Sequence, residues 1–468
     1  MRLYPYRGIR VTVMGLGLFG GGASAARFFA DRGAQVTVTD KRTEDVLKTS
    51  VEALNDLPIR FVLGRHEEAD FTAADIVVVN PGVPDHSPYV LKAREVGVKI
   101  EREMNLLFKL TPNNPKLGVT GSNGKSTTTA MLGEMAKLAD ARTLVGGNMG
   151  RSLLNDTPNL EPGAPLVLEL SSFMLEGLRE TGESPHIAVV TNLSPNHLDR
   201  HGTLANYYNA KKAILESQGP EDFAVLNADD PELANWGGYT PARIIWFSIK
   251  GEPDGDAAFV DGDQLVVRLG GQEEVVAVRE MLRLPGRHNT ANALAASAAA
   301  LACGVQPWQI AEALASFGGL PHRLEMVARN AKNVAFYNDS IATTPESAIC
   351  ALDSFHGPIT LIAGGSDKGS PFDILAEAVA RKVRRLILLG VTGPRIEQAV
   401  REAGEKIGQV PEIRRVDSLE EAATVSCLGA EPGEVVLLSP ACASFDMVRN
   451  FQERGDRFRD LARALVSA

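Results

Sequence analysis

The chain has 468 residues, 44% of them hydrophobic and 23% charged, and a formal net charge of −10. A chain of this length exceeds what one hydrophobic core usually supports, so two or three domains are expected. The acidic balance argues against general binding to nucleic acid or anionic membranes, whose phosphates attract basic surfaces. The sequence has no signal-peptide core, no membrane-spanning apolar stretch and no zinc or disulfide spacing among its four cysteines, so a cytoplasmic protein is expected.

Apolar strand-like runs alternate with helical patterns along almost the whole chain. Many of these runs end in Gly, Asn or Ser, as parallel strands buried on both faces do. The alternation begins anew at residues 9, 116 and 333. This pattern predicts an α/β protein with three domains, each built on a doubly wound sheet.

The domain boundaries are predicted near Asn105 and Leu320, which gives domains at 1–104, 105–319 and 320–468. An Ala-rich helical segment precedes the second boundary. Short β segments and turns at 250–285 predict a hairpin inserted into the central domain.

A glycine-rich loop between a strand and a helix is the strongest local motif. It begins at Gly118, inside the strand, and ends in Gly-Lys-Ser; five residues separate Gly118 from Gly124 and two separate Gly121 from Gly124, so the loop is a variant of the standard P-loop spacing of four. Backbone N–H groups of such a loop, together with the helix N-terminus, bind phosphates. The motif predicts ATP binding, with Lys125 neutralising the terminal phosphates and Ser126 ligating magnesium. The loop residues concerned are Gly121, Ser122, Asn123, Gly124, Lys125, Ser126 and Thr127.

Magnesium needs further ligands beyond one hydroxyl and phosphate oxygens. Glu169 ends a buried strand-like run, where its carboxylate would face the same crevice as the loop. A salt-bridged core glutamate is an equally good interpretation of this residue alone. His197 follows another buried run and is a candidate second ligand, although such a histidine is more often an ordinary hydrogen-bonded residue. Lys211, on the following helix, would by default lie on a solvated face.

The N-terminal segment Gly15-Leu16-Gly17-Leu18-Phe19-Gly20 directly follows a strand, and Asp40 closes the next strand. This is the dinucleotide-binding fingerprint, in which glycines let a diphosphate approach a helix N-terminus and the acid takes hydroxyl groups. The pattern is compatible with NAD and equally with a nucleotide-diphosphate sugar.

Together these motifs resemble the Mur ligase family, in order and over the whole length from Gly15 to Phe458. Within that family the sequence is most similar to enzymes that add D-glutamate to UDP-N-acetylmuramoyl-L-alanine. The resemblance implies an N-terminal Rossmann-like UDP-binding domain, a central P-loop ATPase-type parallel sheet and a C-terminal Rossmann-like domain that brings the amino acid. The segments that carry it are 120–127, 146–150, 168–173, 196–200, 286–292, 320–323, 338–343 and 439–451.

The resemblance also implies ATP and Mg²⁺ as cofactors, and an acyl-phosphate intermediate. It assigns magnesium to Ser126, Glu169, His197 and Lys211, and Lys211 matches a carbamylated lysine, whose added oxygens suit Mg²⁺ where an ammonium would repel it. For the UDP substrate it implies Leu18, Phe19, Asp40, Arg42, Gly82 and Asn148. For the nucleotide it implies His288, Asn289, Asn292, Arg323 and Asp339, and for glutamate Thr343, Lys368, Ser444 and Phe451. Its catalytic set is Lys125, Asn148, His197, Lys211 and Lys368.

Two positions depart from the family pattern. Ile341 stands where the family usually has lysine, and Met174 where glutamine is commoner. Loss of a cation near the amino-acid site leaves open a variant that adds L-glutamate or another amino acid. More distant alternatives are a folylpolyglutamate synthetase, an NAD-dependent dehydrogenase and a nucleotide-sensing regulator. A monomer acting on small molecules, without membrane insertion, is expected.

Overall fold

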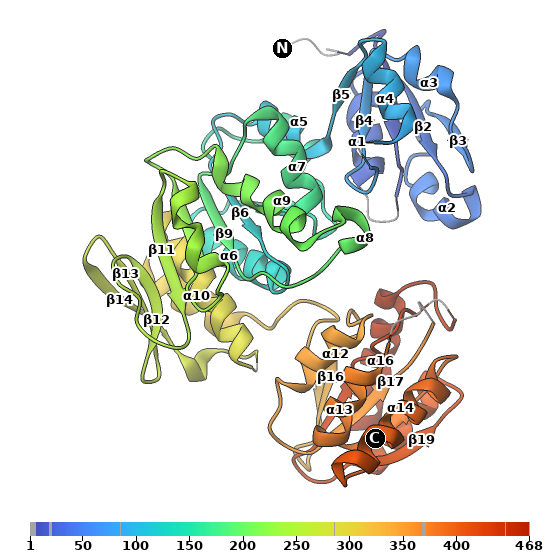
Figure 1. Cartoon of the computed structure of the whole chain (residues 1–468), viewed down its shortest axis with the longest axis vertical. Coiled ribbons are helices and arrows are strands. Elements are labelled where there is room, and N and C mark those ends of the chain that lie inside the picture. The colour runs from blue at the N-terminus through green and yellow to red at the C-terminus, as the bar shows by residue number, and fades with distance from the viewer. Residues whose placement is uncertain are drawn as a thin grey trace. The chain divides into compact units, whose positions relative to one another are not determined.

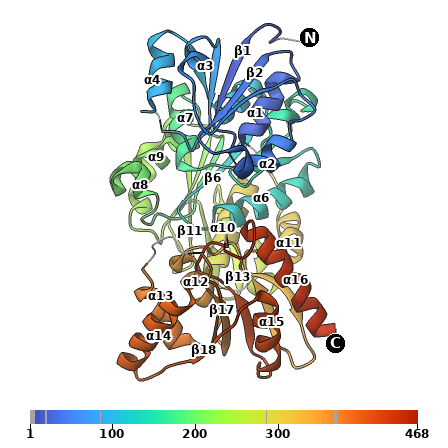
Figure 2. The same cartoon turned by 90° about the vertical axis from the view of Figure 1, so that its right-hand side faces the viewer.

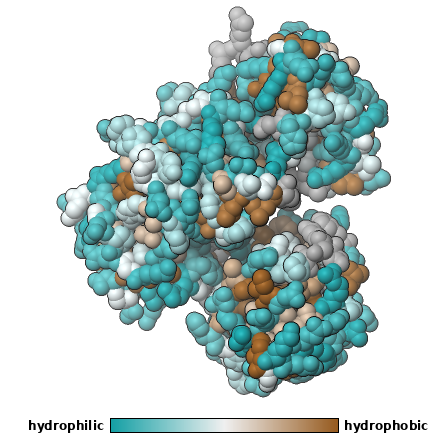
Figure 3. Space-filling model, viewed as in Figure 1, coloured by the Kyte–Doolittle hydropathy of each residue, from teal (hydrophilic) through white to brown (hydrophobic). Residues whose placement is uncertain are grey.

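The computed structural model describes residues 6–17, 21–84, 86–284, 286–366, 371–444 and 446–467. The chain divides into two compact units, the first comprising 1–281 and 290–315 and the second 282–289 and 316–468 (Figure 1). Among the described residues, no helix is long and apolar enough to cross a membrane. The face seen in Figure 3 is mostly hydrophilic, with apolar side chains scattered between polar ones.

The N-terminal part of the first unit is a five-stranded parallel sheet in the order β3-β2-β1-β4-β5. Its strands are β1 (Arg10–Met14), β2 (Gln35–Asp40), β3 (Arg60–Leu63), β4 (Ile76–Val79) and β5 (Lys99–Glu101). The helices are α1 (Gly21–Ala30), α2 (Glu44–Glu52), α3 (Glu68–Thr72), α4 (Pro88–Glu95) and α5 (Glu103–Leu110). Apolar clusters pack α1 and α2 on one face and α3 and α4 on the other. The strand order reverses between β1 and β4, so ligands are expected at the carboxyl ends of these two strands.

The central part is a nine-stranded sheet in the order β14-β13-β12-β11-β10-β9-β6-β8-β7. Its strands are β6 (Lys116–Thr120), β7 (Leu144–Gly147), β8 (Leu166–Glu169), β9 (Ile187–Val190), β10 (Phe223–Asn227), β11 (Arg243–Ser248), β12 (Ala257–Asp261), β13 (Gln264–Leu269) and β14 (Gln272–Val278). Strands β6, β8 and β9 are buried along their whole length, as continuous apolar runs predict. Because β6 lies between β8 and β9, the carboxyl ends of these three strands meet at one edge.

Helices α6 (Lys125–Ala139), α7 (Ser172–Thr181), α8 (Leu198–His201), α9 (Leu204–Glu216), α10 (Arg287–Ala302) and α11 (Pro307–Ser316) accompany this sheet, with 3-10 turns η1 (Leu154–Asn159), η2 (Leu233–Tyr239) and η3 (Arg279–Met281). The predicted inserted hairpin is larger than expected. Strand β12 pairs parallel to β11, and β13 and β14 continue the sheet antiparallel, so the insertion lengthens one sheet edge away from the glycine-rich loop.

The second unit holds a six-stranded sheet in the order β15-β16-β20-β17-β18-β19, in which only the edge strand β15 runs antiparallel. The strands are β15 (Glu325–Arg329), β16 (Ala335–Asn338), β17 (Ile359–Ala363), β18 (Val383–Leu388), β19 (Glu412–Arg415) and β20 (Val435–Leu438). Figure 2 shows α13 (Asp373–Lys382) and α14 (Gly393–Ile407) on one face, and α15 (Leu419–Leu428) and α16 (Phe451–Ser467) on the other. Helix α12 (Pro345–Leu352) joins the first pair.

Three sheets, all mainly parallel and covered by helices on both faces where the strand runs are apolar, confirm the predicted α/β class. The exact boundaries at Asn105 and Leu320 stay predictions.

Candidate active site

The glycine-rich loop joins β6 to α6 in a conformation that only glycine fits at two positions. Gly121 has φ +143° and Gly124 has φ +81°. A Cβ at Gly121 would lie 2.0 Å from Thr191 Oγ1, and one at Gly124 would lie 2.3 Å from Asn292 Oδ1. The backbone therefore approaches its neighbours closely, and the loop leads directly into the N-terminus of a 15-residue helix.

Residues after β9 hold this loop in place. The Ser122 N–H donates to Asn192 O at 2.8 Å, and the Asn123 N–H donates to Asn192 Oδ1 at 2.9 Å. Lys125 Nζ donates to the carbonyls of Gly121 (3.0 Å) and Ser122 (2.9 Å), so its ammonium lies over the loop. A glycine loop, a helix N-terminus and an overlying lysine together fit a chain of phosphates.

Glu169 ends β8 beside this loop, and its side chain is 2% exposed. Its Oε1 accepts a hydrogen bond from Asn148 Nδ2 at 2.7 Å. Its Oε2 is buried and has no hydrogen-bond partner among the groups that the structure describes. A buried carboxylate oxygen without a donor is costly in a native protein unless a ligand completes it, and a hard cation is the ligand that carboxylates suit. These residues therefore fit a magnesium ion better than they fit a closed salt bridge in the core.

Lys211 on α9 is buried, which excludes the solvated-face interpretation. Its Nζ donates to Gly121 O at 2.8 Å and to Thr120 Oγ1 at 3.3 Å. Burial lowers the pKa of Lys211 well below its ordinary value, repulsion from Lys125 adds to this, and the Glu169 carboxylate opposes it. A neutral amine is the form that can react with carbon dioxide, so the environment suits the predicted carbamate.

His197 lies immediately before α8, with φ +52°. Its ring lies 5.2 Å from that of Phe173 and 6.2 Å from that of Tyr207, both edge-on. Among the described residues no group of three or more His, Cys, Asp or Glu side chains is arranged to hold a metal. The predicted magnesium set contains only two residues of these types, so the role of His197 stays a prediction.

The N-terminal fingerprint is held by Asp40, which is buried. Its two oxygens accept the N–H groups of Gly17 (3.2 Å) and Arg42 (2.9 Å), so the acid fixes both loops at the carboxyl ends of β1 and β2. Helix α1 approaches the end of β1 most closely at Gly22, where a Cβ would lie 2.2 Å from Gly15 O. The predicted residues Leu18 and Phe19 lie outside the described residues. Gly82, after β4, is held through its N–H by Asn80 Oδ1 at 3.1 Å.

Comparison with known proteins agrees with this geometry. Three family models match the chain: Mur ligase MurD-like N-terminal domain at residues 9–101, Mur ligase middle domain at 119–300, and Mur ligase, glutamate ligase domain at 322–442. The UDP-N-acetylmuramoylalanine--D-glutamate ligase of Roseiflexus sp. (strain RS-1) is 45% identical, covering 98% of this chain and 99% of that protein. The protein of the same name from Symbiobacterium thermophilum is 43% identical, with 97% and 98% covered. This chain belongs to the Mur ligase family.

Solved Mur ligase structures share the fold. The UDP-N-acetylmuramate-alanine ligase of Thermotoga maritima aligns with a TM-score of 0.62 at 22% identity, covering 97% of this chain and 99% of that one. A pseudomurein peptide ligase from Methanothermus fervidus aligns with a TM-score of 0.56 at 18% identity, covering 97% and 100%. The MurD-like N-terminal domain argues against the dehydrogenase, regulator and folylpolyglutamate synthetase alternatives.

In the second unit of this Mur ligase, the strand order reverses between β17 and β20, which places the ligand crevice at their carboxyl ends. The two following loops are bonded together: Gly364 N–H donates to Pro440 O (2.9 Å) and Ser366 N–H donates to Ala443 O (2.8 Å). The predicted residue Ser444 is in the second loop and is buried. Lys368, from the first loop, lies outside the described residues.

Asp339 follows β16 and is buried beside Ser439 and Arg323. Ser439 Oγ donates to Asp339 Oδ2 at 2.8 Å and the Leu324 N–H donates to Oδ1 at 3.2 Å. Burial raises the pKa of Asp339 to about 7, against the opposing effects of Ser439, Arg323 and Leu324. Arg323 Nε is buried and has no hydrogen-bond partner within the described part of the chain. Of the other predicted nucleotide residues, Asn289 and Asn292 are buried too, whereas His288 is exposed.

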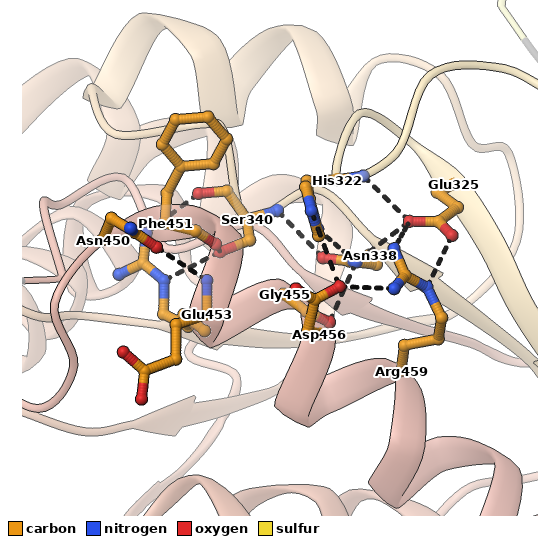
Figure 4. A network of polar contacts seen from close by, with 11 residues as sticks. His322, Glu325, Asn338, Ser340, Asn450, Phe451, Glu453, Gly455, Asp456 and Arg459 are labelled. Carbon is orange, nitrogen blue, oxygen red and sulfur yellow. Dashed lines mark hydrogen bonds and ion pairs between the residues drawn. The ribbon is translucent and has the colours of Figure 1, made fainter. Parts of the chain in front are cut away.

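A polar network surrounds the Asn-Asp-Ser segment (Figure 4). Asn338 Nδ2 lies 3.1 Å from both His322 Nδ1 and Glu325 Oε2. Ser340 Oγ donates to the carbonyl of Phe451 at 2.8 Å, which ties the segment to the first residue of α16. Thr343 is half-buried, and its N–H donates to the carbonyl of residue 341 at 2.8 Å.

Arg454 is a residue that sequence reasoning missed. Its guanidinium is buried and donates to Ser340 Oγ (3.0 Å), Ser340 O (2.9 Å) and Cys442 O (3.1 Å). Burial lowers the pKa of Arg454 to about 10, which still leaves it charged at neutral pH. It brings a cation to the segment in which Ile341 replaces the usual lysine. Nothing in its sequence spacing indicates this contact, because α16 reaches the segment only through the fold.

Proposed function

We propose that this Mur ligase joins D-glutamate to UDP-N-acetylmuramoyl-L-alanine at the expense of ATP. The observation that carries the proposal is the full-length identity of 40–45% to relatives named UDP-N-acetylmuramoylalanine--D-glutamate ligase. The glycine loop and the carboxylate beside it support the ATP-dependent part of this reaction independently of those names.

A carboxylate is a poor acyl donor to an amine at neutral pH, so ATP first converts the alanyl carboxylate into an acyl phosphate. The N–H groups at the α6 N-terminus and Lys125 stabilise charge on the phosphoryl group during transfer. Ser126 and Glu169 Oε2 would hold magnesium, which when bound neutralises phosphate charge. Carbamylated Lys211 would add oxygen ligands for the same ion.

Asn148 is suited to orient the substrate carboxylate. An amide nitrogen carries two protons, and Asn148 Nδ2 donates one of them to Glu169 Oε1. The second can donate to the attacking carboxylate, and the side chain is exposed, so a substrate can reach it. The same residue thus links the metal carboxylate to the reacting group. The UDP moiety would lie against Asp40, Arg42 and Gly82 at the crevice of the N-terminal sheet.

The incoming amino acid would bind in the second unit, at Thr343, Lys368, Ser444 and Phe451. A dicarboxylate needs a cation, a hydroxyl and backbone donors, and this set provides them. The variant that adds L-glutamate or another amino acid rests on Ile341 alone. The buried Arg454 cation weakens that argument, because it provides positive charge under the same segment.

The test is product formation by the purified chain with ATP, Mg²⁺, UDP-N-acetylmuramoyl-L-alanine and D-glutamate, with one phosphate released per amide formed. Lys125→Ala should abolish turnover at saturating substrates. Lys137→Ala is the matched control, because Lys137 lies on the same helix but is exposed and paired with Glu134. Full turnover by Lys125→Ala would disprove the phosphate-loop assignment. The cytoplasmic location and the monomeric state stay predictions.

A further inference from the structure

Helix α8 has only four residues, and it follows His197 directly, so whatever holds this helix also holds that histidine. Inside the central part of the first unit, His201 is its anchor. Ser172 Oγ and His201 Nε2 are hydrogen-bonded at 3.0 Å, and the His201 ring stacks on Phe173 at 5.2 Å between centroids. Ser172 and Phe173 belong to the first turn of α7, three and four residues after Glu169.

Arg200 provides a second anchor, to the N-terminal part of the same unit. Its Nη2 donates to the carbonyl of Val83 at 3.0 Å, across 117 residues of sequence. Val83 follows Gly82, in the loop at the carboxyl end of β4 where the nucleotide-sugar crevice lies. The guanidinium also lies 5.5 Å from the centroid of the Phe173 ring. The Arg200 side chain therefore contacts both the loop after β4 and Phe173, which lies four residues after the predicted metal ligand Glu169.

The other terminal nitrogen of Arg200 is an unused donor. Nη1 is buried and finds no hydrogen-bond acceptor within the part of the chain that the structure describes. Leaving a charged donor buried without an acceptor is costly, so such an atom calls for a ligand. A guanidinium fork suits phosphate and carboxylate oxygens above other acceptors.

We propose that Arg200 Nη1 donates to an anionic oxygen of the bound nucleotide-sugar substrate, and that Arg200 thereby couples this substrate to the position of His197. This inference rests on the proposed function. Arg200 is a substrate-binding and positioning residue: with its second nitrogen engaged, α8 is held from both sides. His197 is then fixed against Phe173 and Tyr207, whose hydroxyl is hydrogen-bonded to Ser122 of the phosphate loop. Binding of the sugar nucleotide then raises the affinity for ATP, and by linkage ATP raises the affinity for the sugar nucleotide by the same factor.

Binding measured by titration calorimetry separates this role from a structural one. The ligands are UDP-N-acetylmuramoyl-L-alanine and a non-hydrolysable ATP analogue with Mg²⁺, each alone and in the presence of the other. In the wild type, each should tighten the other by about 5-fold or more. In Arg200→Ala, the sugar nucleotide should bind about 10- to 100-fold more weakly, the analogue alone should bind as in the wild type, and the mutual enhancement should vanish.

Two further variants make the result decisive. Arg200→Lys keeps the charge but loses the fork, so it should restore part of the affinity and little of the coupling; it decides the question if Arg200→Ala does not fold. Arg142→Ala is the control, because Arg142 is an exposed arginine of the same unit that pairs with Asp140 and Glu161.

Unchanged coupling in the Arg200 variants would overturn the inference and leave the proposed function intact. Equal weakening of both ligands would overturn it as well, since this is what a folding role alone produces. A wild-type chain that binds no sugar nucleotide would overturn the proposed function together with the inference.

Discussion

Asn148 and Glu169 are hydrogen-bonded twice, once through their side chains at 2.7 Å and once from the Asn148 N–H to the Glu169 carbonyl at 2.9 Å. The second bond fixes the loop after β7 against the end of β8. A Cβ at Gly147 would lie 2.3 Å from that same carbonyl, so the approach depends on glycine. The pair therefore forms one rigid element, in which we propose that the amide faces the substrate and the second carboxylate oxygen faces the metal.

Glu169→Gln tests the carboxylate half of this element. Glutamine keeps an oxygen for the Asn148 bond but removes the charge, so the fold should persist while turnover falls at least 10- to 100-fold. The fall should be partly reversed as Mg²⁺ is raised, in steady-state rates measured across a magnesium series. Glu134→Gln, on the exposed face of α6, is the control. A magnesium dependence identical to that of the wild type would contradict the assignment.

Gly121→Ala should abolish nucleotide binding, because its Cβ would overlap Thr191 Oγ1. Backbone strain adds about 1–3 kcal/mol of destabilisation. Gly163→Ala isolates the strain alone, since Gly163 has φ +82° and open space around it; it should cost about 1–2 kcal/mol and leave nucleotide binding intact. Chemical unfolding and nucleotide titration of both variants provide the comparison. Equal effects on binding would disprove a specific role for Gly121.

The activity should depend on carbon dioxide, because we expect Lys211 to be carbamylated. Its lowered pKa provides a neutral amine, and a carbamate would replace a buried amine with oxygen ligands. Enzyme prepared in carbon dioxide-free buffer should lose activity and regain it with bicarbonate, whereas Lys211→Arg should be inactive under both conditions. The mass of the intact protein and the rate before and after bicarbonate are the measurements. Activity that does not respond to bicarbonate would exclude the modification as a requirement.

The raised pKa of Asp339 predicts that the stability of the second unit depends on pH. Its pKa is about 7 in the fold, above that of an unfolded aspartate. Between about pH 4 and 7 the folded chain keeps a proton that the unfolded chain has released, so the free energy of unfolding falls as pH rises through this window. Asp339→Asn is neutral throughout. Its stability should fall less from about pH 5 to 7, by on the order of 1 kcal/mol per pH unit.

Denaturant unfolding of both proteins at the two pH values measures this difference. The same loss of stability in the wild type and in Asp339→Asn would show that another group carries the pH dependence.

The apolar strand runs and the phosphate loop were predictable from sequence, because burial on both faces and phosphate binding each require a local pattern. The order of the strands was not. Thr191 and Asn192 support the loop only because β9 lies beside β6, and no local pattern encodes that neighbour. The insertion at 250–285 was identified as β structure, but its pairing with the edge of the central sheet was missed for the same reason.

Burial was the other quantity that sequence could not provide. Lys211 lies two turns into an ordinary-looking helix, and its buried position follows from packing of α9 over the carboxyl end of β6. The family resemblance, and not the spacing, singled it out. Arg200, although it belongs to the segment 196–200 that carries the resemblance, and Arg454 could be given no role from sequence, because each makes contacts between segments more than 100 residues apart.

Ligation of D-glutamate to UDP-N-acetylmuramoyl-L-alanine is best tested by phosphate release and product mass with D-glutamate, L-glutamate and a panel of other amino acids, in the presence of ATP and Mg²⁺. We expect turnover and an amide product with D-glutamate alone, despite Ile341. Turnover with L-glutamate or another amino acid instead would contradict the proposed specificity, and no turnover with any of them would contradict the assigned reaction.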